Sequence, residues 1–155
     1  MKKYYFDANA LIKYYKKETG SEKIDDLIEN AKPILISRLT FLETIGVLAK
    51  FTRKKLIREK DLMEVIESLR RNIGKNNQIR SFQMIPISDN IFQLAEAILL
   101  ENLASNIQTN DALHLAIVKN LESQAIMVTS DGAMENVCSQ IDVESYNPET
   151  EALND

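Results

Sequence analysis

The sequence of 155 residues contains one cysteine, Cys138, and one histidine, His114. A single cysteine excludes a disulfide within the chain and fits a reducing cytoplasm, so we interpret Cys138 as an inert, partly buried thiol. No apolar run approaches the roughly 20 residues that a membrane span requires. The N-terminal Met-Lys-Lys precedes only a few apolar residues, which does not fit a signal peptide. We therefore expect a cytoplasmic protein that makes no contact with a membrane.

Basic residues are also scarce in one half of the chain. Residues 81–155 carry one basic and twelve acidic side chains, a net −11, whereas residues 50–80 carry ten basic and four acidic ones, a net +6. The overall charge of −4 hides this asymmetry. A basic segment beside an acidic one can attract a polyanion to one face and cations to another, but a solvated helix surface produces the same pattern. Charge alone leaves both interpretations open.

The length and the hydrophobic share of 45% suit one domain with a substantial core. We expect that domain over residues 1–147, followed by a flexible acidic tail over residues 148–155. Short apolar segments predict strands at Tyr4–Phe6, Ile34–Ile36, Phe82–Ile85, Ala125–Thr129 and Ile141–Val143. Helical spacing of apolar residues predicts helices at Ala8–Lys17, Glu22–Asn30, Leu39–Lys54, Lys60–Arg71, Ser88–Leu100 and Thr109–Leu121. The expected N-caps of the last two are Ser88 or Asp89 and Thr109. This alternation indicates an α/β fold with a mostly parallel sheet of about five strands.

Acidic residues follow the predicted strands. Asp7 comes directly after the first strand, and Asp131 comes shortly after the fourth, in IMVTSDGAM. Ser37 ends the second strand and is expected to cap the next helix, and Glu43 lies in the early turns of that helix. Asp111 lies in the first turn of a later helix. Because sites in open α/β sheets lie outside the carboxyl ends of the strands, these four carboxylates are expected to converge.

Carboxylates held close together raise one another's pKa unless a cation lies between them. Oxygen ligands without a histidine cluster or thiolates favour Mg²⁺ or Mn²⁺ over zinc, and such ions assist phosphodiester displacement. Simpler explanations exist: Asp111 favours a helix N-terminus, Asp131 suits a turn, and Glu43 suits an exposed helix position. Asp7 is the hardest to explain otherwise, because an unpaired charge beside an apolar strand is costly.

Five segments of the sequence resemble the PIN-domain family and, within it, the VapC-like ribonuclease toxins of type II toxin–antitoxin systems. They occur in the family's order along nearly the whole chain: YYFDANALIKYYKKETGSE, SRLTFLETIGVLAK, QTNDALHLAIV, MVTSDGAM and SYNP. The resemblance implies a Rossmann-like, three-layer α/β/α domain with a central parallel sheet. It also implies cleavage of single-stranded RNA that depends on Mg²⁺ or Mn²⁺.

The resemblance also implies the roles of particular residues. It assigns the catalytic and metal-binding roles to Asp7, Glu43, Asp111 and Asp131. It implies supporting roles for Asn9, Ser37, Thr40 and Thr129. The chain departs from the family at Ala8, where Ser or Thr is common.

The resemblance further implies an antitoxin partner and a homodimer, and we expect both contacts along the helical pair over residues 39–71. Within this pair, Leu56 and Ile57 fit an interface and the core equally well. The basic residues expected to hold the RNA backbone are Arg38, Arg53, Lys54 and Lys55. His114 follows Asp111 by three residues, where both a general base and a packed helix residue are conceivable, and we favour the second interpretation.

Three other functions fit parts of the pattern. A PIN nuclease of RNA processing or decay carries the same acids without an antitoxin, and a neighbouring gene for a small DNA-binding protein would separate the two cases. A non-catalytic RNA- or protein-binding domain keeps the fold, but the full set of acids disfavours it. A phosphatase with an Asp nucleophile needs a second Asp two residues after Asp7, where the chain has Asn9.

Overall fold

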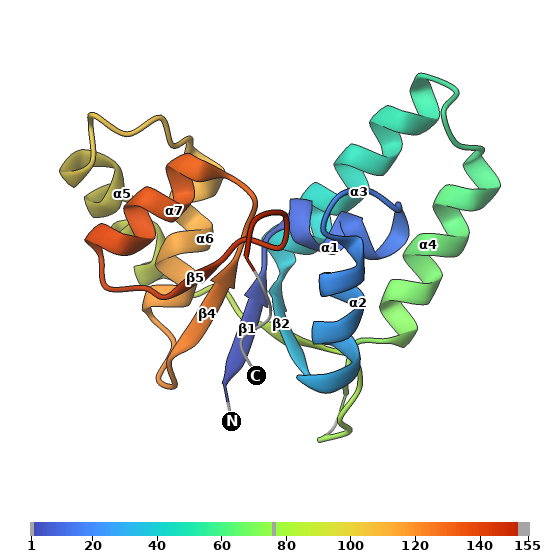
Figure 1. The fold of residues 1–155 in the computed structure, drawn as a ribbon, viewed down its shortest axis with the longest axis horizontal. Coiled ribbons are helices and arrows are strands. Elements are labelled where there is room, and N and C mark those ends of the chain that lie inside the picture. The colour runs from blue at the N-terminus through green and yellow to red at the C-terminus, as the bar shows by residue number, and fades with distance from the viewer. Residues whose placement is uncertain (1, 76, 152–155) are drawn as a thin grey trace.

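The computed structural model describes residues 2–75 and 77–151. Five strands form one parallel sheet in the order β3-β2-β1-β4-β5. The strands are β1 (Lys3–Phe6), β2 (Ile34–Ser37), β3 (Phe82–Ile85), β4 (Ala125–Val128) and β5 (Ser145–Tyr146). The helices are α1 (Ala8–Tyr15), α2 (Ser21–Asn30), α3 (Arg38–Arg53), α4 (Glu59–Arg71), α5 (Asp89–Glu101), α6 (Thr109–Lys119) and α7 (Gly132–Gln140). Figure 1 shows α5, α6 and α7 on one side of the sheet and α1 to α4 on the other, which confirms the predicted three-layer α/β architecture.

The central strand β1 shows how the sequence builds these layers. Successive side chains of a strand point to opposite faces of the sheet. Tyr5 therefore joins the buried cluster beneath α5, α6 and α7, together with Leu35 and Met127, its partners in register. Phe6 joins the cluster beneath α1 and α2. Because all strands are parallel, their carboxyl ends, after Phe6, Ser37 and Val128, lie at one edge of the sheet, which we call the carboxyl edge. The opposite edge, before β1, β4 and β5, is the amino edge.

The last strand differs from the prediction. The apolar segment 141–143 is not a strand, since β5 begins two residues later and a helix, α7, precedes the segment. Asp142 adopts a left-handed conformation with φ of 57°, and the N–H of Val143 donates to the carbonyl of Cys138 over 2.9 Å. This is the hydrogen bond of a Schellman motif, in which the apolar residue after the turn packs back on the helix. The segment therefore ends a helix instead of pairing with β4.

The predicted helix caps are correct in part. Ser37 is the N-cap of α3, and its hydroxyl accepts a bond from a backbone N–H in the first turn. Ser88 is the N-cap of α5, although its side chain makes no capping hydrogen bond. The prediction for α6 was wrong, because the N-cap is Gln108 and not Thr109. The Asp111 side chain accepts a bond from the backbone N–H of Gln108 over 2.8 Å, so the N-cap lies one residue before Thr109.

The chain after β5 is attached to α1. Lys13 exposes only 3% of its side chain, and its Nζ donates to Glu18 over 2.9 Å and to Glu149 over 2.8 Å. A buried ammonium group is stable only with such partners. We expected a flexible tail over residues 148–155, but its described part, 148–151, makes this anchoring contact. Residues 152–155 lie outside the described residues.

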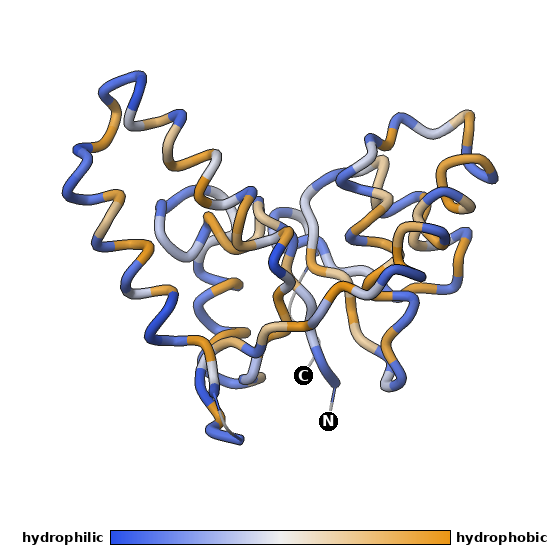
Figure 2. The backbone as a smooth tube through the Cα atoms, turned by 180° about the vertical axis from the view of Figure 1, so that it is seen from behind, coloured by the Kyte–Doolittle hydropathy of each residue, from blue (hydrophilic) through white to orange (hydrophobic). Residues whose placement is uncertain are grey.

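Helices α3 and α4 form a hairpin that extends away from the sheet (Figure 1). Leu42, Leu56 and Met63 on this hairpin expose 66%, 65% and 49% of their surfaces, and α4, which is described throughout, buries only Leu69. Figure 2 shows a mostly hydrophilic tip, which corresponds to residues 53–58. Leu56 is therefore a surface residue and not part of the core. Three exposed apolar side chains therefore lie along this hairpin.

Two expectations about the chain as a whole concern its cysteine and the membrane. Cys138 lies on the buried face of α7, and burial raises the pKa of its thiol to about 12. Because the thiolate is the reactive form, this agrees with an inert thiol.

Within the described ranges, no helix has both the length and the apolar character needed to cross a membrane.

Candidate functional site

Four acidic side chains from four different elements lie at the carboxyl edge. Asp7 follows β1 and is the N-cap of α1, and Asp131 follows β4 and is the N-cap of α7. Glu43 lies in the second turn of α3, and Asp111 lies in the first turn of α6. The charges influence one another, since Glu43 raises the pKa of both Asp7 and Asp111, and Asp131 raises the pKa of Asp111. The structure therefore brings together the four acids that the strand ends pointed to.

Asp7 is the most buried of the four acids, with 4% of its surface exposed. Its Oδ1 accepts a hydrogen bond from the backbone N–H of Ala10 over 2.8 Å, so the side chain caps α1. Burial raises the pKa of Asp7 above its ordinary value, although the His114 charge, the Ala10 N–H and the Thr129 hydroxyl act in the opposite direction. A bound cation would stabilise the ionised form that burial destabilises.

Asp131 and Asp111 are each fixed by backbone N–H groups. Oδ1 of Asp131 accepts bonds from Ala133 and Met134 over 2.9 and 3.2 Å, and Oδ2 of Asp111 accepts from Gln108 over 2.8 Å. The second carboxylate oxygen of each accepts no hydrogen bond from the described residues. Burial, followed by the charges of nearby acids, raises the pKa of Asp111 even though the Gln108 N–H opposes the shift. Each side chain thus has one anchored oxygen and one oxygen available to a ligand.

Glu43 differs from the other acids because both of its oxygens are bound by side chains. Oε1 lies 2.6 Å from Nε2 of His114, and Oε2 accepts a bond from Nδ2 of Asn110 over 2.8 Å. Burial alone would raise the pKa of Glu43, but the hydrogen bond and charge of His114 and the Asn110 amide outweigh it and lower the pKa. Glu43 therefore remains an ionised carboxylate.

A buried hydroxyl network lies behind His114. The Tyr5 hydroxyl lies 2.7 Å from Nδ1 of His114 and 2.8 Å from Oγ of Ser37. The same hydroxyl lies 3.3 Å from Oγ1 of Thr40. Thr40 in turn donates to the carbonyl of Phe6 over 2.9 Å. Burial raises the pKa of Tyr5 strongly, so the phenol stays protonated. His114 is 2% exposed and has both ring nitrogens engaged, which is the packed arrangement that we favoured.

The acids lack basic partners. Within the described part of the chain, Asp7, Asp111 and Asp131 form no ion pair with lysine or arginine, and Glu43 pairs with His114 alone. No three acidic, histidine or cysteine side chains of the described residues enclose a ready-made metal cage. The donor chemistry nevertheless fits a hard divalent cation, since the acids supply oxygens and the buried Ser130 hydroxyl beside Asp131 lacks a partner among the described residues.

The other predicted residues divide into two groups. Ser37, Thr40 and Thr129 are buried at the carboxyl edge, where the first two belong to the Tyr5 network and Thr129 accepts from the N–H of Asp131 over 3.1 Å. Asn9 and Arg38 are exposed in the first turns of α1 and α3, beside the acids. The second group, Arg53, Lys54 and Lys55, does not lie at the carboxyl edge. These residues are at the hairpin tip, where Arg53 is about 15 Å along the α3 axis from Glu43.

Two residues of the site were missed from the sequence. Asn110 had no assigned role, although it precedes His114 by four residues and so shares its helix face. Tyr5 was taken only as part of an apolar strand. The hydroxyl of Tyr5 was the signal that could have identified it, since a buried tyrosine hydroxyl usually finds a hydrogen-bond partner.

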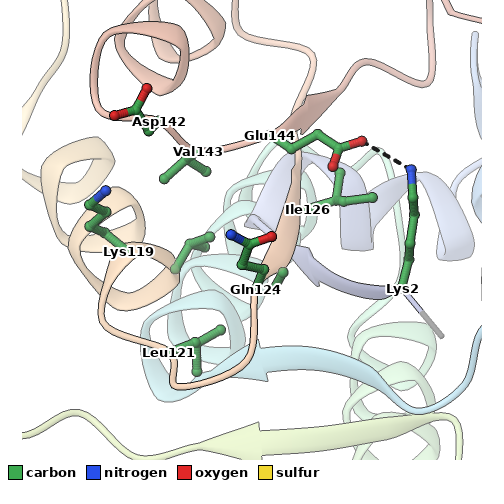
Figure 3. A pocket seen from close by; sticks show the side chains of 10 residues that line it. Lys2, Lys119, Leu121, Gln124, Ile126, Asp142, Val143 and Glu144 are labelled. Atoms are coloured by element: carbon green, nitrogen blue, oxygen red, sulfur yellow. Dashed lines mark hydrogen bonds and ion pairs between the residues drawn. The ribbon is translucent and has the colours of Figure 1, made fainter.

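A hollow lies at the amino edge, away from the acids (Figure 3). It has a volume of about 560 Å³ and is lined by charges of both signs, among them Lys2, Lys119, Asp142 and Glu144. Lys2 and Glu144 pair over 3.2 Å with side chains that are 59% and 61% exposed, and Lys119 donates to a backbone carbonyl over 2.7 Å. These groups are solvated or already partnered, and none of the predicted site residues lies here.

Comparisons with known proteins agree with the fold. Residues 4–139 match a model of the PIN domain, which confirms the resemblance seen in the motifs. FitAcB from Neisseria gonorrhoeae is 17% identical, with a TM-score of 0.66 over 95% of this chain and 99% of the other. A toxin–antitoxin complex from Klebsiella pneumoniae is 18% identical, with a TM-score of 0.60 over 94% and 97%. VapC20 from Mycobacterium tuberculosis, a sarcin–ricin-loop-cleaving toxin, is 11% identical, with a TM-score of 0.64 over 85% and 92%. A comparison with curated protein sequences gave no significant match.

Proposed function

Because this chain belongs to the PIN domain family, we propose that it is a divalent-metal-dependent endoribonuclease that cleaves single-stranded RNA. The observation that carries the proposal is the convergence of Asp7, Glu43, Asp111 and Asp131 at the carboxyl edge. A cation that lies between buried like charges without lysine or arginine partners stabilises their ionised forms. Hydrolysis of a phosphodiester is a reaction that such a cation assists.

In this proposal Asp7 and Asp111 are the principal ligands of Mg²⁺ or Mn²⁺, and Glu43 and Asp131 complete or support the site. The ion supplies acidification of water and stabilisation of negative charge around phosphorus. The chain supplies rigidity, since Asp7 and Asp131 are N-caps whose side chains are fixed by the first turns of α1 and α7. Asn9, exposed beside Asp7, is placed to contact the substrate.

The basic side chains provide a path for the RNA backbone. Arg38 is exposed at the first position of α3, where it can bind a phosphate next to the scissile one. Arg53, Lys54 and Lys55 lie at the far end of the same helix, so they would contact phosphates several nucleotides away. Phosphate contacts of this kind hold the strand without reading its sequence.

We further propose that the nuclease is the toxin of a toxin–antitoxin pair and acts in the cytoplasm. Structures of similar fold come from toxin–antitoxin assemblies, including the complex from Klebsiella pneumoniae. The exposed apolar residues Leu42, Leu56 and Met63 on the α3–α4 hairpin provide a surface for the antitoxin or for a second copy of the chain. A PIN nuclease of RNA processing is the alternative within the same chemistry.

Cleavage of a labelled RNA pool tests the proposal. Wild type and Asp7→Asn are incubated with Mg²⁺ or Mn²⁺, with and without EDTA, beside a generic phosphate monoester. We expect cleavage of RNA alone, its loss in EDTA, and its loss in the variant. Equal cleavage by both proteins would identify a contaminating nuclease. Absence of cleavage together with absence of Mn²⁺ binding would leave a non-catalytic binding domain, and hydrolysis of the monoester would indicate a phosphatase.

A further inference from the structure

We propose that His114 and Asn110 are positioning residues that clamp the Glu43 carboxylate in the orientation that the metal site requires. This inference rests on the proposed function, because it concerns how one carboxylate of that same site is held. Neither residue is one of the four proposed metal ligands, and the sequence motifs assign no role to Asn110. The clamp explains why Glu43, unlike Asp111 and Asp131, has a hydrogen bond on each of its carboxylate oxygens.

The geometry of the clamp involves two helices. Asn110 and His114 lie four residues apart in α6 and therefore on one face, whereas Glu43 extends from α3. His114 Nε2 lies 2.6 Å from Oε1, and Asn110 Nδ2 donates to Oε2 over 2.8 Å. A glutamate side chain has three rotatable bonds, and two donors on separate oxygens fix the rotation of the carboxylate as well as its position. Each oxygen keeps a second lone-pair direction for a ligand.

The hydrogen-bond directions follow from the chemistry of the groups. An ionised Glu43 can only accept, so Nε2 of His114 carries the hydrogen. Nδ1 of His114 lies 2.7 Å from the Tyr5 hydroxyl, and the protonation state of the ring decides which of the two groups donates. The hydrogen of Ser37, 2.8 Å from the Tyr5 oxygen, can be donated to that oxygen. A continuous hydrogen-bonded chain thus runs from Ser37 through Tyr5 and His114 to Glu43.

This chain gives His114 a rigid support. Tyr5 is fully buried in the central strand, and Ser37 is fully buried at the end of β2, so the imidazole ring is fixed from behind by the sheet. A general base needs a nitrogen that faces water or substrate, whereas both nitrogens of His114 are engaged and the residue is 2% exposed. Partners that orient a metal-binding side chain in this way typically change metal affinity or activity by about 10–100-fold when they are removed.

Mn²⁺ binding to the full chain, measured by calorimetry, tests the clamp. Asn110→Ala and His114→Phe each remove one donor, whereas His114→Gln retains an amide N–H near the position of Nε2. Asn120→Ala, at the C-cap of the same helix, is the control. We expect the first two variants to bind Mn²⁺ about 10–100-fold more weakly. His114→Gln should recover most of that loss, and the control should bind like wild type.

A double-mutant cycle with Glu43→Gln separates positioning from a general loss of structure. If the clamp acts through Glu43, adding His114→Phe to Glu43→Gln produces no further loss of Mn²⁺ affinity. Circular dichroism and thermal unfolding verify the fold, and the partly exposed Asn110→Ala keeps the test usable if His114→Phe does not fold.

Three results would overturn the clamp. The first is that Asn110→Ala binds Mn²⁺ as tightly as wild type. The second is that His114→Phe lowers Mn²⁺ affinity as much in the Glu43→Gln background as in wild type. The third is that His114→Gln binds Mn²⁺ as weakly as His114→Phe. If wild type binds Mn²⁺ and cleaves RNA, and the variants bind Mn²⁺ equally well, the clamp is wrong but the proposed function stands. If wild type binds no Mn²⁺ and cleaves no RNA, the proposed function falls and the clamp falls with it.

Discussion

The two edges of the sheet are made by the same strands but carry different arrangements of charge. At the amino edge, charges of both signs line a hollow of about 560 Å³, and Lys2 and Glu144 pair in solvent over 3.2 Å (Figure 3). At the carboxyl edge, four acids gather with one histidine, and Asp7 is 4% exposed. One edge is open and electrostatically balanced, whereas the other is partly buried and carries an excess of negative charge.

The difference shows that the size of a hollow does not identify a chemical site. Exposed ion pairs contribute roughly 0–1 kcal/mol and need no further explanation. Burial and neighbouring acids raise the pKa values of Asp7 and Asp111, and pKa shifts of this kind cluster at functional sites. Substitutions at each edge test whether the carboxyl edge is a functional site and the amino edge is not.

The largest expected effect is on catalysis, from Asp7→Asn. Loss of a metal ligand removes several kcal/mol of transition-state stabilisation, so cleavage should fall at least about 100-fold. Asparagine keeps the N-cap, and it removes a buried charge. The free energy of unfolding of the metal-free variant should therefore equal or exceed that of wild type. Cleavage rates and urea unfolding measure the two quantities.

Glu144→Gln is the matched control at the amino edge, because it neutralises one carboxylate in the same way. Its cleavage rate should equal that of wild type. A loss as large as that of Asp7→Asn would mean that overall charge, and not the carboxyl edge, determines activity.

The next effect concerns RNA affinity. Replacing Arg53, Lys54 and Lys55 together by Gln should weaken RNA binding at low salt. If all three contact phosphates, the slope of log affinity against log salt should become less steep by about 2, as expected for three phosphate contacts on a single strand. Filter binding at several salt concentrations measures the slope, and the double variant Lys2→Gln, Lys119→Gln is the control at the amino edge. An unchanged slope in the triple variant would exclude the hairpin tip from the RNA path.

A smaller effect is expected on the pH dependence of stability without metal. Burial raises the pKa of Asp7, so the folded state binds this proton more tightly than the unfolded state. The stability of wild type relative to Asp7→Asn should therefore fall as pH rises from the ordinary aspartate range through the raised pKa. Above that pKa, the stability of wild type relative to Asp7→Asn should not change further with pH. Urea unfolding in EDTA across this range measures it, and a relative stability that rises with pH would contradict the raised pKa.

The smallest effect is expected from Lys2→Ala at the amino edge. Its ion pair with Glu144 is more than half exposed on both sides, so the free energy of unfolding should change by less than about 1 kcal/mol. Cleavage should not change. A larger loss of stability in thermal unfolding would show that the amino edge is structurally more important than its exposure suggests.

Most of the fold could be predicted because local signals and tertiary packing agree. Four strands were found from short apolar segments, and Asp7, Ser37 and Asp131 marked the points where strands end. The prediction failed at residues 141–143, because an apolar segment that ends a helix resembles a short strand when its left-handed Asp142 is not apparent. The single-domain boundary at residue 147 remains a prediction.

The site could be predicted only at the level of its acids. Their positions after strands follow from the parallel sheet, which has one carboxyl edge. The contacts between Glu43, His114 and Asn110 depend on how α3 and α6 lie next to each other, and no spacing within the sequence specifies this. The separation of Arg53 from Glu43 follows from the length of α3, since ten residues of a helix span about 15 Å.

The central claim is that the carboxyl edge, and not the amino edge, binds the divalent ion. Paramagnetic broadening of backbone amide signals by Mn²⁺ tests it most directly, because the two edges are about 13 Å apart along a four-residue strand. The account predicts that substoichiometric Mn²⁺ broadens Ala8, Ala10 and Gly132 first and leaves Ala125 and Glu144 sharp. Broadening centred on Ala125 and Glu144, or no selective broadening at all, would contradict it.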